Sequence, residues 1–399
     1  MILNGTSIDL LLTCLFFFIP MPYHWLTSPT PDLASTLIQI VIFRYFIEAV
    51  YFNPEKKERI EYISFAAILS ALLITIKLNN VVYAIGLGIV TIIFGKKYNL
   101  DSLEKKQIGR AFIFIGIFFF LWITRGYIQT GYPLFPSTLG SINTKWTVPK
   151  QLANYEYNVI YSTSRSYDTI HNINSPLLQN YNWLPFWFKH NYFNENLYLS
   201  DDYFENIEII IILLLAPSTV YNWGIGSITL MFISLILIII YFIKLSIDKN
   251  IFYKSRFLVY LLLIEIVSLI FWFLSAPSPR FANGIFIITF ITSLLLLKTA
   301  YSWLSVNRQI KTILLLYSLF MFIWNFNIAY QNKEFVVSCI TPPPSPPMLE
   351  RTTDYGLKLL IPQEKNCQGW SIIPSSPSFN KYLSLIGSTL DSGFCIKLK

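Results

Sequence analysis

The sequence contains few charged residues. Asp, Glu, Lys and Arg together make up 13% of its 399 residues, whereas a soluble domain usually carries about 25%. Hydrophobic residues make up 54% of the chain, and several apolar runs reach roughly 15–20 residues, which is enough to span a bilayer. This composition excludes a soluble multidomain protein and predicts a multi-pass membrane protein.

Metal-binding residues are scarce as well. The chain has three His and four Cys, without a CxxC pair and without the spacing of a zinc site. We therefore predict no metal site, although the sequence leaves open a requirement for a divalent metal as cofactor. The net charge of +8 comes from Lys and Arg between the apolar runs, which is typical of cytoplasmic loops and not of a nucleic-acid interface. Membrane lipids are the predicted partners, and no nucleic acid is expected.

The apolar runs predict a membrane part that is all α-helical and has about nine transmembrane helices. The predicted spans are 8–19, 33–52, 60–77, 81–95, 111–124, 225–244, 257–274, 282–297 and 312–330. The shorter apolar run 207–215 stops just before Pro217 and is predicted to be interfacial or re-entrant. Four loops between the spans are basic, at 56–59, 96–110, 244–256 and 298–311. Placing all four in the cytoplasm satisfies the positive-inside rule with this set of spans, and it puts the C-terminus outside.

Four parts of the chain follow from this topology. They are the N-terminal membrane helices (1–124), an extracytoplasmic loop domain between spans five and six (125–206), the C-terminal membrane helices (207–330) and a small extracytoplasmic tail domain (331–399). The tail is predicted to contain short strands at Lys358–Pro362, Gly369–Ile373 and Phe394–Lys397, separated by turn residues. Cys367 and Cys395 are the pair that we favour for a disulfide there.

Three of the charged residues within predicted spans are candidates for a function, because a charge at the centre of a helix costs at least about 2.5 kcal/mol. Arg44 and Glu48 are four residues apart on one helix and can neutralise each other, so a structural pair explains them as well as a functional one. Glu265 lies near the middle of its span and has no partner nearby in the sequence. It therefore needs a partner from another helix or a change in its protonation.

Further candidates lie on the predicted outer face. Asp32 lies where a loop meets a span. It is a candidate catalytic acid, and it is equally suited to cap the N-terminus of a helix. Arg125 and Arg280 lie at the level of phospholipid headgroups, where a guanidinium group can bind a phosphate with two hydrogen bonds or anchor the end of a helix.

His24, Tyr127 and Tyr132 lie in the same outer regions. They are candidates to contact a substrate, because aromatic faces suit sugar rings. Anchoring at the membrane interface and packing within the loops explain these residues as well.

Several short motifs occur in a distinctive order. They are Arg-x-Tyr-x-x-x-Gly-Tyr-Pro-Leu-Phe-Pro (125–136), Lys-Trp-Thr-Val-Pro (145–149), Pro-x-Pro-Arg-Phe (277–281), Asn-Cys-Gln-Gly-Trp (366–370) and Ser-Gly-Phe-Cys-Ile-Lys (392–397). Together they resemble a family of uncharacterised bacterial polytopic membrane proteins. That family is similar in layout to the GT-C membrane glycosyltransferases, in which a Gly-x-Pro-x-x-Pro-like segment follows a later span, as Gly131, Pro133 and Pro136 do here.

The resemblance implies an enzyme of the bacterial inner membrane that serves the synthesis of cell-envelope polysaccharide. Such an enzyme takes a sugar from a polyprenyl-phosphate donor and transfers it on the outer face of the membrane. Its catalytic acid lies in the first outer loop, which implies Asp32, and Arg125 and Arg280 would neutralise the leaving phosphate. Members of the family usually begin further upstream. If the N-terminal spans are truncated here, Asp32 is not the catalytic residue.

Two other classes of function remain open from the sequence. A transporter or flippase of a lipid-linked glycan would depend on Glu265 and Arg44 more than on the outer loops. A non-catalytic factor in envelope assembly would depend on an intact outer loop and tail, and single charges would matter less.

Overall fold

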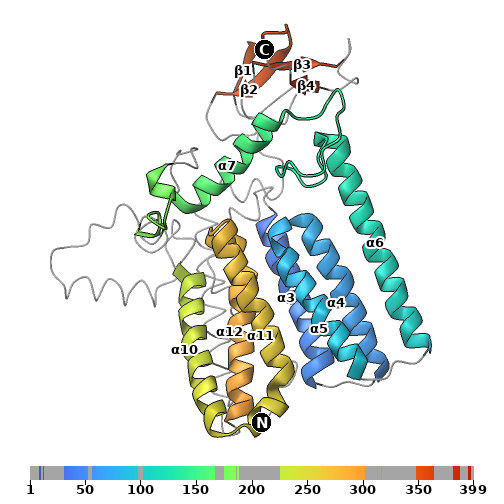
Figure 1. The fold of residues 1–399 in the computed structure, drawn as a ribbon, viewed down its shortest axis with the longest axis vertical. Helices are drawn as coiled ribbons and strands as arrows, with labels where there is room; N and C mark the ends of the chain where they lie inside the picture. The colour runs from blue at the N-terminus through green and yellow to red at the C-terminus, as the bar shows by residue number, and fades with distance from the viewer. Residues whose placement is uncertain are drawn as a thin grey trace, which may run out of the picture. The chain divides into compact units, whose positions relative to one another are not determined.

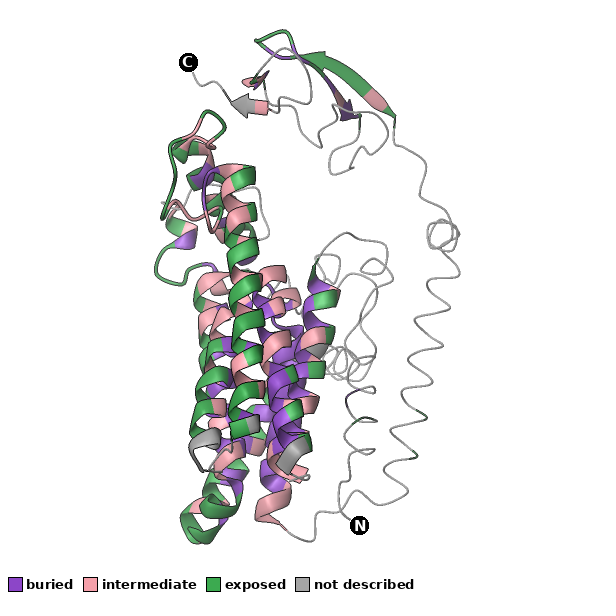
Figure 2. Cartoon of the chain, turned by 90° about the vertical axis from the view of Figure 1, so that its right-hand side faces the viewer, coloured by how far each residue is buried: buried purple, intermediate pink, exposed green. Residues whose placement is uncertain are grey.

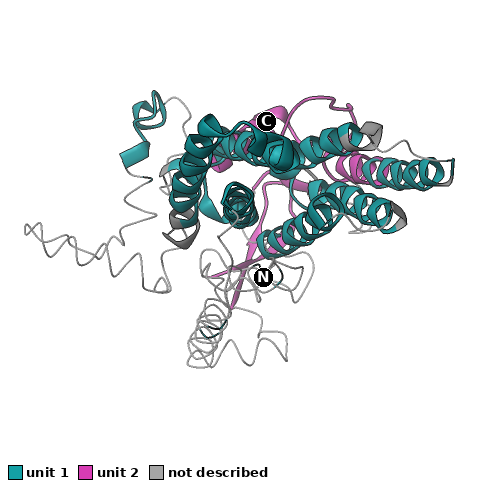
Figure 3. Ribbon diagram, turned by 90° about the horizontal axis from the view of Figure 1, so that it is seen from below, with its two compact units in different colours: residues 1–119, 161–331 teal, residues 120–160, 332–399 magenta. Residues whose placement is uncertain are grey.

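The computed structural model describes residues 31–52, 56–97, 102–166, 175–185, 187, 225–301, 347–363, 381–386 and 394–396, together with residues 9, 12, 312 and 316. The chain divides into two compact units (Figure 3). Unit 1 consists of residues 1–119 and 161–331, and unit 2 of residues 120–160 and 332–399. Helices α6 (Ser102–Thr130) and α7 (Lys150–Ser166) each pass from one unit into the other.

Unit 1 is a helical bundle whose successive helices run in opposite directions (Figure 1). Besides parts of α6 and α7, its elements are α3 (Asp32–Ile47) with a π-helical end η1 (Glu48–Phe52), α4 (Lys56–Ile76), η2 (Leu78–Asn80), α5 (Val81–Lys97), η3 (Pro176–Leu178), α10 (Ile225–Ile247), α11 (Asn250–Ser275), η4 (Pro279–Phe281) and α12 (Asn283–Ala300). The short turns η2 and η4 each connect two antiparallel neighbours, α4 with α5 and α11 with α12.

The helices are apolar enough to form a membrane domain. Among the described residues, six helices have the length and composition to cross a membrane, and Leu78–Ile93 is a shorter apolar stretch. The predicted multi-pass, helical membrane part is therefore confirmed. The predicted spans 8–19 and 312–330 and the apolar run 207–215 lie almost wholly outside the described residues, so the number of nine spans remains a prediction.

Helix α12 is the central helix of unit 1 and packs against α3, α10 and α11. The most apolar window of α12 is 72% buried, against 6% for α6, and Figure 2 shows this contrast in burial among the helices. The sequence explains the difference, because α12 carries apolar or small side chains on every side, including the fully buried Thr292 and Ser293. A helix that is apolar all round suits the centre of a membrane bundle, and small hydroxyl residues let its neighbours approach closely.

Helix α6 is longer than the sequence indicated. The prediction that the chain turns into a loop at Arg125 was wrong, because the helix continues to Thr130 and the residues in between are compatible with helix. Gly131 ends the helix with a φ of +78°, a conformation that favours glycine. Its N–H donates to the carbonyl of Tyr127 at 2.9 Å, and Val148 N–H donates to the Thr130 carbonyl at 2.9 Å, which folds the following loop back onto the helix end.

The C-terminal part of unit 2 contains two small antiparallel ladders. Strand β1 (Met348–Thr352) pairs with β2 (Lys358–Pro362), and β3 (Leu383–Leu385) pairs with β4 (Phe394–Ile396). The strand predicted at 358–362 is confirmed, and so is the one near the C-terminus. The segment 369–373 and Cys367 lie outside the described residues. The sequence did not predict β1, because its residues do not alternate in polarity and all but the first are exposed.

Two glycines of α5 provide a matched test of its packing against α11. A Cβ atom at Gly86 would lie 2.5 Å from Cγ2 of Ile264, whereas a Cβ atom at Gly88 would meet no atom within 4 Å. We expect Gly86→Ala to lower the free energy of unfolding in detergent by about 1–3 kcal/mol, because overpacking displaces Ile264. Gly88→Ala should be neutral or slightly stabilising. Equal shifts in the thermal unfolding of the two variants would contradict this packing.

Candidate functional site

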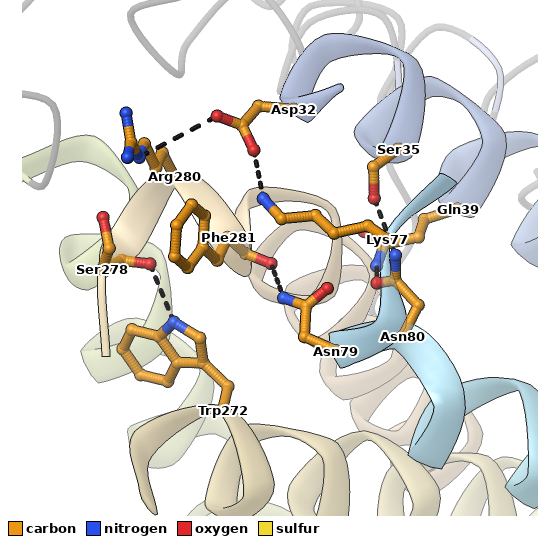
Figure 4. Close-up of polar contacts among 10 residues, drawn as sticks. All are labelled: Asp32, Ser35, Gln39, Lys77, Asn79, Asn80, Trp272, Ser278, Arg280 and Phe281. Carbon is orange, nitrogen blue, oxygen red and sulfur yellow. Dashed lines mark hydrogen bonds and ion pairs between the residues drawn. The ribbon is translucent and has the colours of Figure 1, made fainter. Parts of the chain in front are cut away.

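Asp32, Lys77 and Arg280 lie together at one end of the unit 1 bundle (Figure 4). Asp32 is the first residue of α3, Lys77 follows α4, and Arg280 lies in η4. Lys77 Nζ donates to Asp32 Oδ1, and Asp32 Oδ2 lies 3.9 Å from Arg280 Nε. Three segments that are far apart in the sequence thus place one carboxylate between two cations, and we call this cluster the Asp32 site.

Asp32 is 3% exposed, and the positive charge of Lys77 compensates its buried negative charge. Pro31 occupies the N-cap position of α3, and no side chain caps the helix. The alternative that Asp32 serves as an N-cap is therefore wrong. Removing one partner of a buried ion pair leaves the other charge uncompensated, which typically costs about 3–5 kcal/mol, so the pair holds the ends of α3 and α4 together.

Lys77 is more deeply buried than Arg280. Its Nζ lies 3.7 Å from the centre of the Phe281 ring. Burial lowers the pKa of Lys77 to about 8, while Asp32 counteracts this effect and Arg280 adds to it. Lys77 therefore loses its charge at a pH at which an exposed lysine keeps it.

Three amide side chains fix the turn that follows Lys77. Gln39 Nε2 donates to Asn80 Oδ1 at 2.5 Å, and Asn80 Nδ2 donates to Ser35 Oγ at 2.9 Å. Asn79 Nδ2 donates to the carbonyl of the last residue of η4 at 3.0 Å. These bonds tie η2 to α3 on one side and to η4 on the other, so the backbone next to Lys77 is held from two directions.

Buried indole groups hold the loop that carries Arg280. Trp272 Nε1 donates to the carbonyl of Ser278 at 2.8 Å, and Trp187 Nε1 donates to the carbonyl of Pro277 at 2.6 Å. The two indole rings also contact each other, with their centres 6.2 Å apart. The backbone immediately before η4 is therefore fixed by aromatic side chains from two segments.

Arg165 of α7 binds the end of α11, just before the loop that carries Arg280. Its guanidinium group donates to the carbonyl of Leu274 at 2.6 Å and to that of Ser275 at 3.1 Å. The group stacks on the ring of Tyr161, 3.4 Å from its centre. A cation at the C-terminal end of a helix is favourable, because the last carbonyls lack partners within the helix. Arg165 thereby closes the end of α11.

Arg280 is the member of the Asp32 site that is open to a ligand. Its side chain is 40% exposed, and within the described part of the chain its buried Nε has no hydrogen-bond acceptor. The site carries two positive charges and one negative charge, so it favours an anion. A guanidinium group can bind phosphate oxygens with two parallel hydrogen bonds.

Three other predicted site residues lie in unit 2, a different unit from the Asp32 site. Arg125 is exposed on the last turns of α6. The hydroxyls of Tyr127 and Tyr132 donate to the carbonyls of Gly140 and Val148, each at 2.9 Å. The two tyrosines therefore stabilise the loop that follows α6.

The predicted membrane charges all have partners. Arg44 donates from Nη1 to Glu48, and its Nε and Nη2 face the carboxylate of Asp9. Glu265 is buried in the bundle and accepts a hydrogen bond from Thr292 of α12 at 2.8 Å. His24 lies outside the described residues. Among the residues that the structure describes, no group of three or more His, Cys, Asp or Glu could hold a metal ion.

Sequence reasoning missed Lys77 and Arg165. Lys77 was counted as the end of a predicted span, but a signal was present, since Asp32, Lys77 and Arg280 all border spans on the same predicted face. Arg165 lies in the predicted outer loop, and nothing in the sequence links it to carbonyl groups more than a hundred residues away.

The fold and the Asp32 site define a multi-pass membrane protein with a charged cluster at one end of its helical bundle. More specifically, the chain belongs to a protein family described as Domain of unknown function (DUF8201), which matches residues 2–216. This match covers more than half of the chain and includes Asp32 and Lys77 but not Arg280. No significant match was found among curated proteins or among solved structures.

Lys77 is expected to make stability depend on pH. Because the folded-state pKa of about 8 lies below the ordinary value of 10.5, the unfolded chain binds more protons between these pH values, and the free energy of unfolding rises with pH there. The thermal unfolding midpoint of the wild type should therefore rise above pH 8 relative to that of Lys77→Met. Asp32→Asn removes the carboxylate that opposes the effect of burial on the pKa of Lys77. The rise in the unfolding midpoint of this variant should therefore begin at a lower pH. Parallel pH profiles for the wild type and Lys77→Met would contradict this account.

Proposed function

We propose that the protein is a GT-C-like glycosyltransferase of the bacterial inner membrane. It would take a sugar from a polyprenyl-phosphate donor and add it to a cell-envelope polysaccharide. The observation that supports this proposal best is the Asp32 site, in which a carboxylate and two cations meet at one end of the membrane bundle. The lipid-linked phosphate of such a donor lies at the membrane surface.

The distribution of charge supports an outward orientation of the Asp32 site. In unit 1 the clusters of Lys and Arg lie at the helix ends that are remote from the Asp32 site. These are the start of α4, the end of α5, the starts of α6 and α11 and the end of α12. The positive-inside rule places those ends in the cytoplasm. The Asp32 site then faces the extracytoplasmic side. The proposed topology keeps nine spans and an extracytoplasmic C-terminus.

Arg280 would bind the phosphate of the donor, and Lys77 would support it from a deeper position. As the bond between sugar and phosphate breaks, the phosphate keeps the electron pair, and the two cations stabilise the charge that develops on it. Arg280 fits this role because its side chain is partly exposed and is held by a rigid loop.

Asp32 would act as the general base that accepts the proton of the acceptor hydroxyl. The proton later passes to the phosphate product, so atoms and charges balance. Because Asp32 is almost fully buried, the acceptor reaches it only after Arg280 turns toward the phosphate. Donor binding would thus expose the base. Arg125, Tyr127 and Tyr132 retain their predicted roles toward phosphate and sugar as proposals, and they have no assigned place in the Asp32 site.

Arg280→Gln tests the phosphate role. We expect this variant to bind polyprenyl phosphate at least about tenfold more weakly, because it loses a charge-assisted hydrogen-bonding group. Binding to the wild type in nanodiscs is measured against polyprenol, which has the same chain but no phosphate. Arg256→Gln is the matched control, since Arg256 lies in the first turns of α11 at the other end of the bundle. Unchanged binding by Arg280→Gln with cooperative unfolding would remove the phosphate role.

Asp32→Asn separates catalysis from binding. A transferase predicts that this variant still binds polyprenyl phosphate but no longer transfers the sugar from a radiolabelled polyprenyl-phosphate donor to endogenous acceptor in membranes. Asp32→Asn with full transfer would contradict the proposed base. Binding without any transfer by the wild type, over a panel of donor sugars, would favour a flippase or an assembly factor instead.

A further inference from the structure

Glu265 is a buried charge that the proposed transfer reaction does not use. It lies near the middle of α11 and is 0% exposed. None of the ion pairs among the described residues includes it. An isolated carboxylate in an apolar interior is too costly to persist without compensation, and for this reason ionisable residues within a membrane are functional candidates by default.

Hydroxyl groups from two neighbouring helices surround this carboxyl group. Thr292 Oγ1 of α12 donates to Glu265 Oε1 at 2.8 Å. Thr289, one turn earlier on α12, lies within hydrogen-bonding reach of the same carboxyl group. Tyr83 of α5 is fully enclosed and lies within electrostatic reach of Glu265. The close approach of α5 and α11 at Gly86 and Ile264 brings these groups together.

One carboxyl oxygen of Glu265 and two hydroxyl oxygens near it lack an ordinary hydrogen-bond partner among the described residues. Glu265 Oε2, Tyr83 Oη and Thr289 Oγ1 are buried, and within the described part of the chain none of them forms a hydrogen bond of ordinary length and angle, although Thr289 lies close to the carboxyl group. Buried polar atoms are nearly always satisfied, so each exception needs an explanation such as a bound water or ion. Three exceptions around a single carboxyl group point to a shared ligand that all of them contact.

We propose that Glu265, Tyr83, Thr289 and Thr292 form a binding site for one Na⁺ ion in the interior of the membrane bundle. All the groups present oxygen atoms, which are hard ligands that suit hard cations and not soft transition metals. One carboxylate balances one positive charge, whereas a dedicated divalent site recruits more carboxylates. The hydroxyl groups complete the coordination without adding charge.

A bound ion here would join α5, α11 and α12, because each of these helices contributes a ligand. Na⁺ binding would then stabilise the bundle in proportion to the ion concentration, since a ligand that binds only the folded state raises its stability. The site shares no residue with the Asp32 site, so its test does not depend on the proposed transfer reaction.

The test is the binding of ²²Na⁺ to the purified full-length protein in detergent, with choline as the replacement cation. We expect saturable binding of about one ion per chain. Glu265→Gln should abolish this binding. Glu48→Gln should leave it intact, because Glu48 lies on a different membrane helix and pairs with Arg44.

Thr292 variants keep the test decisive if Glu265→Gln fails to fold. Thr292→Val removes the hydroxyl at nearly constant volume and should weaken Na⁺ binding about tenfold or more, whereas Thr292→Ser should retain it. Absence of saturable ²²Na⁺ binding by a cooperatively unfolding wild type would overturn the proposal. Equal Na⁺ binding by Thr292→Val and Thr292→Ser would also overturn it. The same holds if the stability of the wild type responds to pH but not to the Na⁺ concentration.

Discussion

The ion pair between Asp32 and Lys77 is the interaction on which one end of the unit 1 bundle depends. Both groups are taken out of water, Asp32 almost completely, so neither can be removed without leaving a buried charge. The pair also fixes a geometry, because it joins the start of α3 to the end of α4. Arg280, on the loop between α11 and α12, completes the arrangement from the other half of the bundle.

The structure around this pair is built to keep backbone segments in place. Amide side chains hold η2 against α3 and η4. On the opposite side, Arg165 and two indole groups bind the carbonyls at the end of α11 and in the following loop. Gly284, just inside α12, has no room for a side chain because Gln39 occupies that space. Rigid support of this kind suits a site that must present a charge at a fixed position.

Composition and apolar runs were sufficient to predict the membrane class, the helical bundle and the strand at Lys358–Pro362, because these features depend on local patterns. The end of α6 was misplaced since Arg125 and Tyr127 are as compatible with helix as with loop. Asp32 and Arg280 were predicted as candidates from their position beside spans. Their contact with Lys77, and the closure of α11 by Arg165, depend on tertiary packing between distant segments, which residue patterns do not encode.

A double-mutant cycle on Asp32 and Lys77 tests the central claim most directly. The free energy of unfolding in mixed micelles is measured for the wild type, Asp32→Asn, Lys77→Met and the double variant. The account predicts that each single substitution is strongly destabilising and that the double variant loses much less than the sum, with a coupling of about 1–3 kcal/mol. Additive effects would show that the two residues do not interact, and the Asp32 site would then not exist as described.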